Sequence, residues 1–100
     1  MINNSKISKN INQWHIEYDQ NEFLSNENWL ATAEKAEDIL QLSYINKKGP
    51  ILDVGFYREC YKIYVIYNND WEKPKEVFES NKTEFIESKL YELIDKYANG

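Results

Sequence analysis

The chain has 100 residues, which is enough for one domain and too few for two hydrophobic cores. Its content of 42% hydrophobic and 29% charged residues excludes global disorder. The net charge is −5, and residues 11–46 carry most of it, with seven carboxylates against a single base, Lys35. Such a surface repels nucleic-acid phosphates and attracts basic proteins. The plainer interpretation is a solvated acidic surface without a partner.

Cysteine content and hydropathy point to a cytoplasmic protein. The single cysteine, Cys60, excludes an intramolecular disulfide and fits a reducing compartment. No apolar run approaches the roughly 20 residues of a membrane span, so we expect no membrane partner. Residues 1–12 lack the apolar stretch of a secretory signal. We therefore expect one domain over residues 1–100, with a frayed polar lead-in over 1–12.

The N-terminal half predicts a strand followed by a helix. Residues 13–18 alternate apolar and polar side chains, which indicates a short strand with one wet face. Residues 27–46 then show helical spacing, and Gly49 and Pro50 would end that helix. The apolar positions of this expected helix are Trp29, Ala33, Ala36, Leu40 and Tyr44. Trp14 and Trp29 lie on apolar faces and are expected in the core.

The C-terminal half predicts three strands and a final helix. Two apolar strands are expected at 51–58 and 61–67, and Pro74 makes the next one, about 75–79, an edge strand. The closing helix is expected over 82–97, with an apolar stripe facing the core. The resulting fold class is α+β, in the order β-α-β-β-β-α. We expect an antiparallel sheet of three or four strands packed against two helices.

Catalytic and metal-binding patterns are weak in this sequence. The only histidine is His15 and the only thiol is Cys60, and a wet strand face and a strand end explain both residues. His15, Glu17 and Asp19 would share one face of a regular strand, but a hydrated edge explains them as well as a metal site does. We therefore expect no catalytic residue, no cofactor and no metal.

A nucleic-acid partner is also not expected. The order α-β-β-β-α is that of a double-stranded-RNA-binding domain, which places a lysine cluster at the start of its last helix. Here that turn reads Asn81-Lys82-Thr83-Glu84, with Glu87 following. One lysine beside two glutamates gives the wrong electrostatic field for phosphates.

Aromatic residues favour a protein-binding surface. The chain has eight tyrosines and three tryptophans, residue types that are enriched in interface hot spots. Tyr57 and Tyr64 are expected on the strand faces that point away from the helices, beside Asp53. The alternative is that these tyrosines simply tile a half-exposed sheet. Trp71 either anchors a partner or closes the sheet edge.

The C-terminal half resembles immunity proteins of bacterial contact-dependent growth-inhibition and other polymorphic toxin systems. The resemblance is carried by residues 48–57 (KGPILDVGFY), the strand 61–67 and residues 69–74 (NDWEKP). It implies a cytoplasmic, non-catalytic inhibitor that is monomeric when free. Its partner would be a cognate toxin domain, and the acidic surface indicates a basic nuclease.

The partner-binding residues are inferred from the sequence itself. They are Asp53, Tyr57, Tyr64, Asp70, Trp71 and Glu72 from the strands and turns, with Glu34 and Asp38 from the expected helix. The two groups could lie on opposite sides, and the strand-and-turn group is then the preferred interface. The second hypothesis is an adaptor or structural subunit that uses the same aromatic face for a permanent partner or for self-association.

Overall fold

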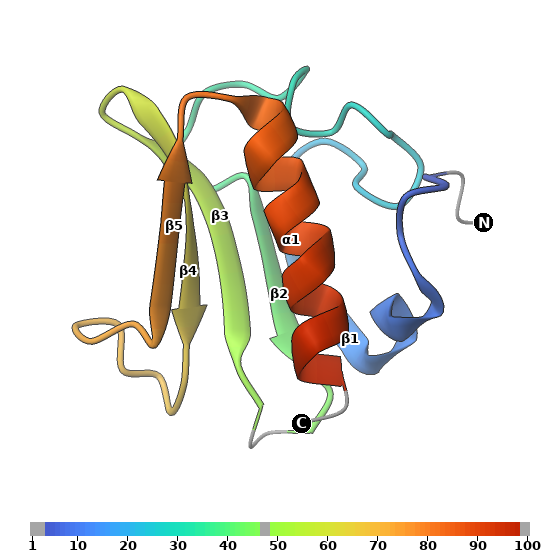
Figure 1. The fold of residues 1–100 in the computed structure, drawn as a ribbon, viewed down its shortest axis with the longest axis vertical. Coiled ribbons are helices and arrows are strands. Elements are labelled where there is room, and N and C mark those ends of the chain that lie inside the picture. The colour runs from blue at the N-terminus through green and yellow to red at the C-terminus, as the bar shows by residue number, and fades with distance from the viewer. Residues whose placement is uncertain (1–3, 47–48, 99–100) are drawn as a thin grey trace.

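A computed structural model describes residues 4–46 and 49–98, which form one five-stranded antiparallel sheet and one α-helix (Figure 1). Each strand pairs with the next one along the chain, in the order β1-β2-β3-β4-β5. The elements are a 3-10 helix η1 (Lys9–Gln13), β1 (Trp14–Asp19), β2 (Leu40–Tyr44), β3 (Ile51–Tyr57), β4 (Cys60–Ile66), β5 (Glu76–Ser80) and α1 (Thr83–Ala98). The expected sheet of three or four strands against two helices is therefore wrong.

The expected helix over residues 27–46 does not form. Residues 20–39 make turns and irregular backbone, and the last part of the expected helix is instead strand β2. Polar side chains hold these turns: Thr32 Oγ1 donates to the Asn28 carbonyl at 2.7 Å, and Gln20 Oε1 accepts from the Glu34 backbone N–H at 2.7 Å. Side chains that bond the backbone locally compete with a helix.

Strand β2 shows why the helical spacing was misleading. Leu40 and Leu42 are fully buried, whereas Gln41 and Ser43 between them are only partly buried. This is a period of two, and it matches the pairing of β2 with both β1 and β3. This pairing satisfies the backbone N–H and C=O groups that β1 and β3 turn toward β2. A helix in this position would leave those groups without partners.

Strands β3 and β4 are the two apolar strands that the sequence predicts, and in the sheet they lie between β2 and β5. They pair from Ile51 with Ile66 to Tyr57 with Cys60, across a two-residue turn. Arg58 in this turn has a φ of 59°, in the left-handed region. Asn68 and Asn69 lie in the same region after β4, a conformation that asparagine tolerates well.

Helix α1 covers one face of the sheet (Figure 1). The stripe expected in the core is buried, with Ile86, Leu90, Leu93, Ile94 and Tyr97 all at most 6% exposed. It meets the buried side chains of the sheet, which include Leu42, Leu52, Val54, Ile63 and Val65. Phe85 lies outside this buried stripe and is 46% exposed.

The N-terminal segment completes the core beside α1. Trp14 and Trp29 are 5% and 1% exposed, which agrees with the expectation that both belong to the core. Residues 4–12 are not a frayed lead-in in this structure, because Asn4 is only 1% exposed and its side-chain amide donates to the Phe23 carbonyl at 3.1 Å. Ile11 of η1 is buried as well.

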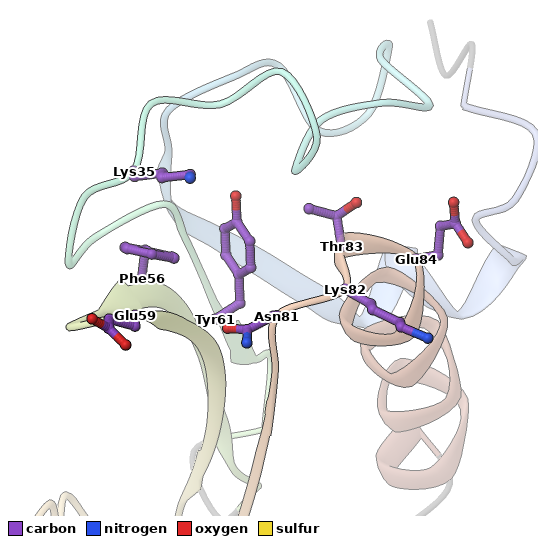
Figure 2. Close-up of a pocket in the computed structure, with 8 residues that line it drawn as sticks. All are labelled: Lys35, Phe56, Glu59, Tyr61, Asn81, Lys82, Thr83 and Glu84. Atoms are coloured by element: carbon purple, nitrogen blue, oxygen red, sulfur yellow. The ribbon is translucent and has the colours of Figure 1, made fainter.

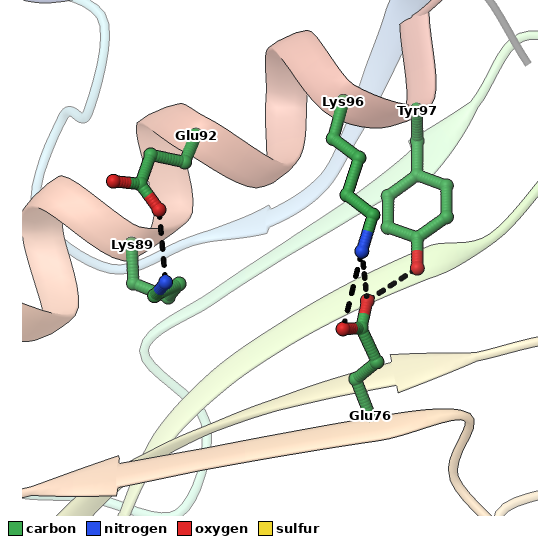
Figure 3. A network of polar contacts seen from close by, with 5 residues as sticks. All are labelled: Glu76, Lys89, Glu92, Lys96 and Tyr97. Carbon is green, nitrogen blue, oxygen red and sulfur yellow. Dashed lines mark hydrogen bonds and ion pairs between the residues drawn. The ribbon is translucent and has the colours of Figure 1, made fainter.

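A polar cluster ties β5 to the end of α1 (Figure 3). The Glu76 carboxylate accepts a short hydrogen bond from the Tyr97 hydroxyl and pairs with Lys96 Nζ at 3.1 Å. The hydrogen bond from Tyr97 is the main reason that the pKa of Glu76 lies below its usual value. The edge strand expected at 75–79 is thus present as β5 and fastened to the helix.

Candidate protein-binding face

The face of the sheet opposite α1 carries one row of side chains that crosses all five strands. The residues pair in sequence: Tyr18 with Gln41, Gln41 with Asp53, Asp53 with Tyr64, and Tyr64 with Val77. Residues directly opposite each other in an antiparallel sheet share a face. Tyr18 and Val77, at the two ends of the row, are each 46% exposed. We call this surface the open face.

An irregularity in β1 places Tyr18 on the open face. The pairing of β1 with β2 shifts between Ile16 and Tyr18, so that one extra residue, Glu17, is inserted. A bulge of this kind reverses the alternation of the side chains that follow it. Asp19 therefore pairs with Leu40 of the covered face, and its carboxylate accepts from the Phe23 backbone N–H at 3.0 Å.

This bulge also separates the residues considered for metal binding. His15, Glu17 and Asp19 would share a face only in a regular strand, and the register shift sends Asp19 to the other side. Within residues 4–46 and 49–98, no group of three His, Cys, Asp or Glu side chains is placed to hold a metal ion. The sequence-based assumption of one shared face is thus incorrect.

His15 and Cys60 are also too far apart to act as a catalytic pair. His15 lies on β1 and Cys60 on β4, with β2 and β3 between them. Three strand spacings amount to roughly 14 Å. A proton transfer between these side chains would need hydrogen-bond distance.

Asp53 is the central residue of the open face, and it is only 4% exposed. Its two carboxylate oxygens accept one hydrogen bond each, from Gln41 Nε2 and from the Tyr57 hydroxyl, both at 3.4 Å. Burial raises the pKa of Asp53 to about 6, and the nearby charge of Asp38 acts in the same direction. The hydrogen bonds from Gln41 and Tyr57 oppose this rise without cancelling it.

Two tyrosine rings stand beside Asp53. Tyr57 and Tyr64 meet edge to face, with ring centroids 5.7 Å apart and an interplanar angle of 83°. Burial, followed by the charge of Asp53, raises the pKa of Tyr57, so this residue stays a neutral donor at physiological pH.

Gly55 leaves room for the chain to cross the open face close to Asp53. A Cβ at this position would lie 1.9 Å from the Glu37 carbonyl oxygen, which no side chain can tolerate. The backbone of residues 36–39 packs here, since the Phe56 N–H donates to the Ala36 carbonyl at 2.8 Å and the Ile39 N–H donates to Val54 at 3.0 Å. The absence of a side chain at Gly55 therefore lets Asp38 come near Asp53.

The open face is negatively charged. Its acids include Glu17, Asp53 and Glu79, with Asp38 at its margin close enough to affect Asp53. Lys62 is a base on the same face, and its Nζ is paired with Glu79 at 3.5 Å. A cationic partner would thus find carboxylates with little competition from the described bases.

The sequence-predicted site residues fall into three places. Asp53, Tyr57 and Tyr64 lie together on the open face, with Asp38 nearby. Asp70, Trp71 and Glu72 lie in the connection between β4 and β5, at the end of the sheet opposite the β3–β4 turn (Figure 1). Trp71 is 47% exposed, so it does not close the sheet edge. Glu34 is exposed in the segment 20–39 and is not brought next to Asp53 by any contact described above.

Sequence reasoning missed Tyr18, Gln41 and Val77. Gln41 could have been found, because Leu40-Gln41-Leu42-Ser43-Tyr44 alternates apolar and polar residues in the manner of a strand. Tyr18 could not, since regular alternation groups it with Trp14 and nothing in the sequence marks the bulge. Val77 belongs to an edge strand that the sequence located without assigning its faces.

Three hollows formed by described residues lie outside this row. One, of about 370 Å³, adjoins the open face and is lined by residues that include Glu17, Ile51 and Ile66. A second, of about 410 Å³, lies beside the β3–β4 turn and is lined by residues that include Tyr57, Lys62 and Glu79. The third, of about 600 Å³, lies at the start of α1 (Figure 2). Its walls carry Lys35 and Lys82 against Glu59 and Glu84, so its charges favour neither sign of ligand.

Comparisons with known proteins add no assignment: no protein-family model matches the chain, and neither the curated proteins nor the solved structures gave a significant match. In the described part of the chain, no helix has the length and apolar character needed to cross a membrane.

Proposed function

We propose that this chain is an immunity protein that binds and neutralises a cognate toxin domain, a basic nuclease, through the open face. The observation that carries the proposal is the row across the uncovered side of the sheet, with a buried carboxylate at its centre and tyrosines around it. Carboxyl groups with a strongly perturbed pKa cluster at functional sites, which supports this choice of surface.

Charge complementarity indicates a basic partner. The chain has a net charge of −5, and the open face carries more acids than bases. A nuclease binds phosphates and therefore presents a basic cleft, which such a face would attract and steer. Tyr57 and Tyr64 supply rigid aromatic area, which slows dissociation once water is excluded. In this proposal the inhibitor acts in the cytoplasm, where the toxin would otherwise cut nucleic acid.

Both edges of the sheet favour a monomer in the free state. Strand β1 is bulged at Glu17, and β5 follows Pro74 and carries Glu76 and Glu79. Bulges, prolines and charges at sheet edges oppose pairing with a second copy. The alternative of a self-associating structural subunit predicts a tight homodimer, and sedimentation of the isolated chain distinguishes the two.

Isothermal titration against the toxin domain encoded immediately upstream of the gene tests the proposal. We expect a nanomolar or tighter Kd that weakens as salt rises, because the attraction is electrostatic. Tyr64→Ala should weaken binding at least tenfold, whereas Phe85→Ala, which removes an exposed aromatic ring from α1, should leave it unchanged. An absence of binding, or equal losses in both variants, would contradict the proposal.

A further inference from the structure

Asp53 is a buried acid whose own surroundings neutralise it poorly. None of the three ion pairs formed by residues 4–46 and 49–98 includes it. Its two hydrogen bonds, at 3.4 Å each, are at the long limit for such contacts. A carboxylate offers about four acceptor positions, and a buried one without compensation is costly.

The geometry points to an arginine side chain of the bound partner as the missing counter-ion of Asp53. This inference rests on the proposed function, because it takes the open face to be the docking surface. It goes further by naming the group that is recognised and the residue that recognises it.

Arginine fits this position better than lysine. Each Asp53 oxygen keeps acceptor capacity beside its single bond, so the forked guanidinium can engage both oxygens at once. The Tyr57 and Tyr64 rings stand next to the carboxylate and provide aromatic surface on which a planar cation stacks. The groups bonded to Asp53 are the side-chain ends of Gln41 and Tyr57, which can rotate aside without moving the backbone.

Within the described part of the free protein, the titratable groups that act on Asp53 are Asp38, from the segment 20–39, and Tyr57 of β3, while Gln41 of β2 is neutral. Lys62 of β4, a base on the same face, lies opposite Gly55 and is paired with Glu79. A partner's guanidinium would be the first cation beside Asp53, and it would lower the pKa of this carboxyl from about 6. Binding should thus release a proton near pH 6, and affinity should fall as the pH drops below that value.

The test uses methylguanidinium chloride as the probe and NMR of the whole chain at about pH 7.5, where Asp53 is ionised. We expect a saturable shift of the Asp53 carboxyl carbon and of the Tyr57 and Tyr64 ring signals. Methylammonium chloride at the same ionic strength should give a weaker response. Asp53→Asn should abolish the ring shifts, and Asp95→Asn, which removes the same charge from an exposed position of α1, should preserve them.

Equal responses from the two variants, or no saturable shift at Asp53, would overturn the inference. Titration of the toxin domain separates it from the proposed function. If the toxin binds Asp53→Asn as tightly as the natural chain, the arginine inference fails and the immunity function stands. If methylguanidinium binds at Asp53 and the toxin does not bind at all, the site stands and the immunity function fails.

Discussion

Replacing Asp53 with asparagine should make the folded protein more stable at neutral pH. The natural carboxylate is 4% exposed and has no counter-ion among the described residues, so its charge is held in an unfavourable place. Asparagine keeps the shape and can still bond Gln41 and Tyr57, but it carries no charge. The change removes the unfavourable burial of a charge without opening a cavity.

The size of this gain in stability follows from the pKa of Asp53, which burial raises from 3.8 to about 6. At 1.36 kcal/mol per pH unit this interval corresponds to about 3 kcal/mol. Relaxation of the neighbouring side chains around the buried charge reduces it to about 1–2 kcal/mol. The sign is fixed because the folded state holds the proton more tightly than the unfolded state. The contribution of Asp53 to the free energy of unfolding is therefore greatest below about pH 4. It falls between pH 4 and pH 6 and is constant at higher pH.

Urea unfolding followed by tryptophan fluorescence at a series of pH values measures this effect. Trp14 and Trp29 are buried and report on the core. The quantity of interest is the difference in the free energy of unfolding between Asp53→Asn and the natural chain, since other titrating groups cancel in it. We expect this difference to increase by about 1–2 kcal/mol from pH 4 to pH 7. A difference that does not change with pH would refute the reasoning.

Two further substitutions test the packing behind the open face and the link between β5 and α1. Gly55→Ala should lower the free energy of unfolding by about 2 kcal/mol or more, because its Cβ would meet the Glu37 carbonyl at 1.9 Å; an unchanged urea midpoint would contradict this. Tyr97→Phe removes the donor to Glu76 and should cost about 1 kcal/mol at pH 7. The pKa of Glu76 is lowered in the folded state, so this loss of stability should shrink as the pH falls below 4.5 and Glu76 becomes protonated. A loss that is equally large in acid would contradict this prediction.

The C-terminal half was predictable because each of its elements has a strong local signal. Strands β3 and β4 are long apolar runs, Pro74 marks an edge strand, and the stripe of α1 recurs at helical spacing. These signals agree with the tertiary packing, so local and global preferences point the same way. The placement of Asp53, Tyr57 and Tyr64 away from the helix followed from the alternation alone.

The strand expected at 13–18 is present as β1, but the rest of the N-terminal half was not predictable, for two physical reasons. The apolar residues of 27–46 fit helical spacing by coincidence, and the strand they contain is stabilised by pairing with β1 and β3, which are distant in sequence. The turns of 20–39 depend on particular side-chain bonds, such as the one from Asn21 Nδ2 to the Trp29 carbonyl at 2.9 Å. The bulge at Glu17 leaves no mark in the sequence, so the full row across the sheet could not be foreseen.

The most direct test of the account is to map the bound surface by NMR on the complex with the toxin domain. We predict that signals of Tyr18, Gln41, Asp53, Tyr64 and Val77 change together on binding, since these residues form one row across the open face. The exposed side of α1, reported by Phe85, should remain unaffected. Changes confined to α1 or to the loop around Trp71, with the row unperturbed, would contradict the assignment of the open face as the binding surface.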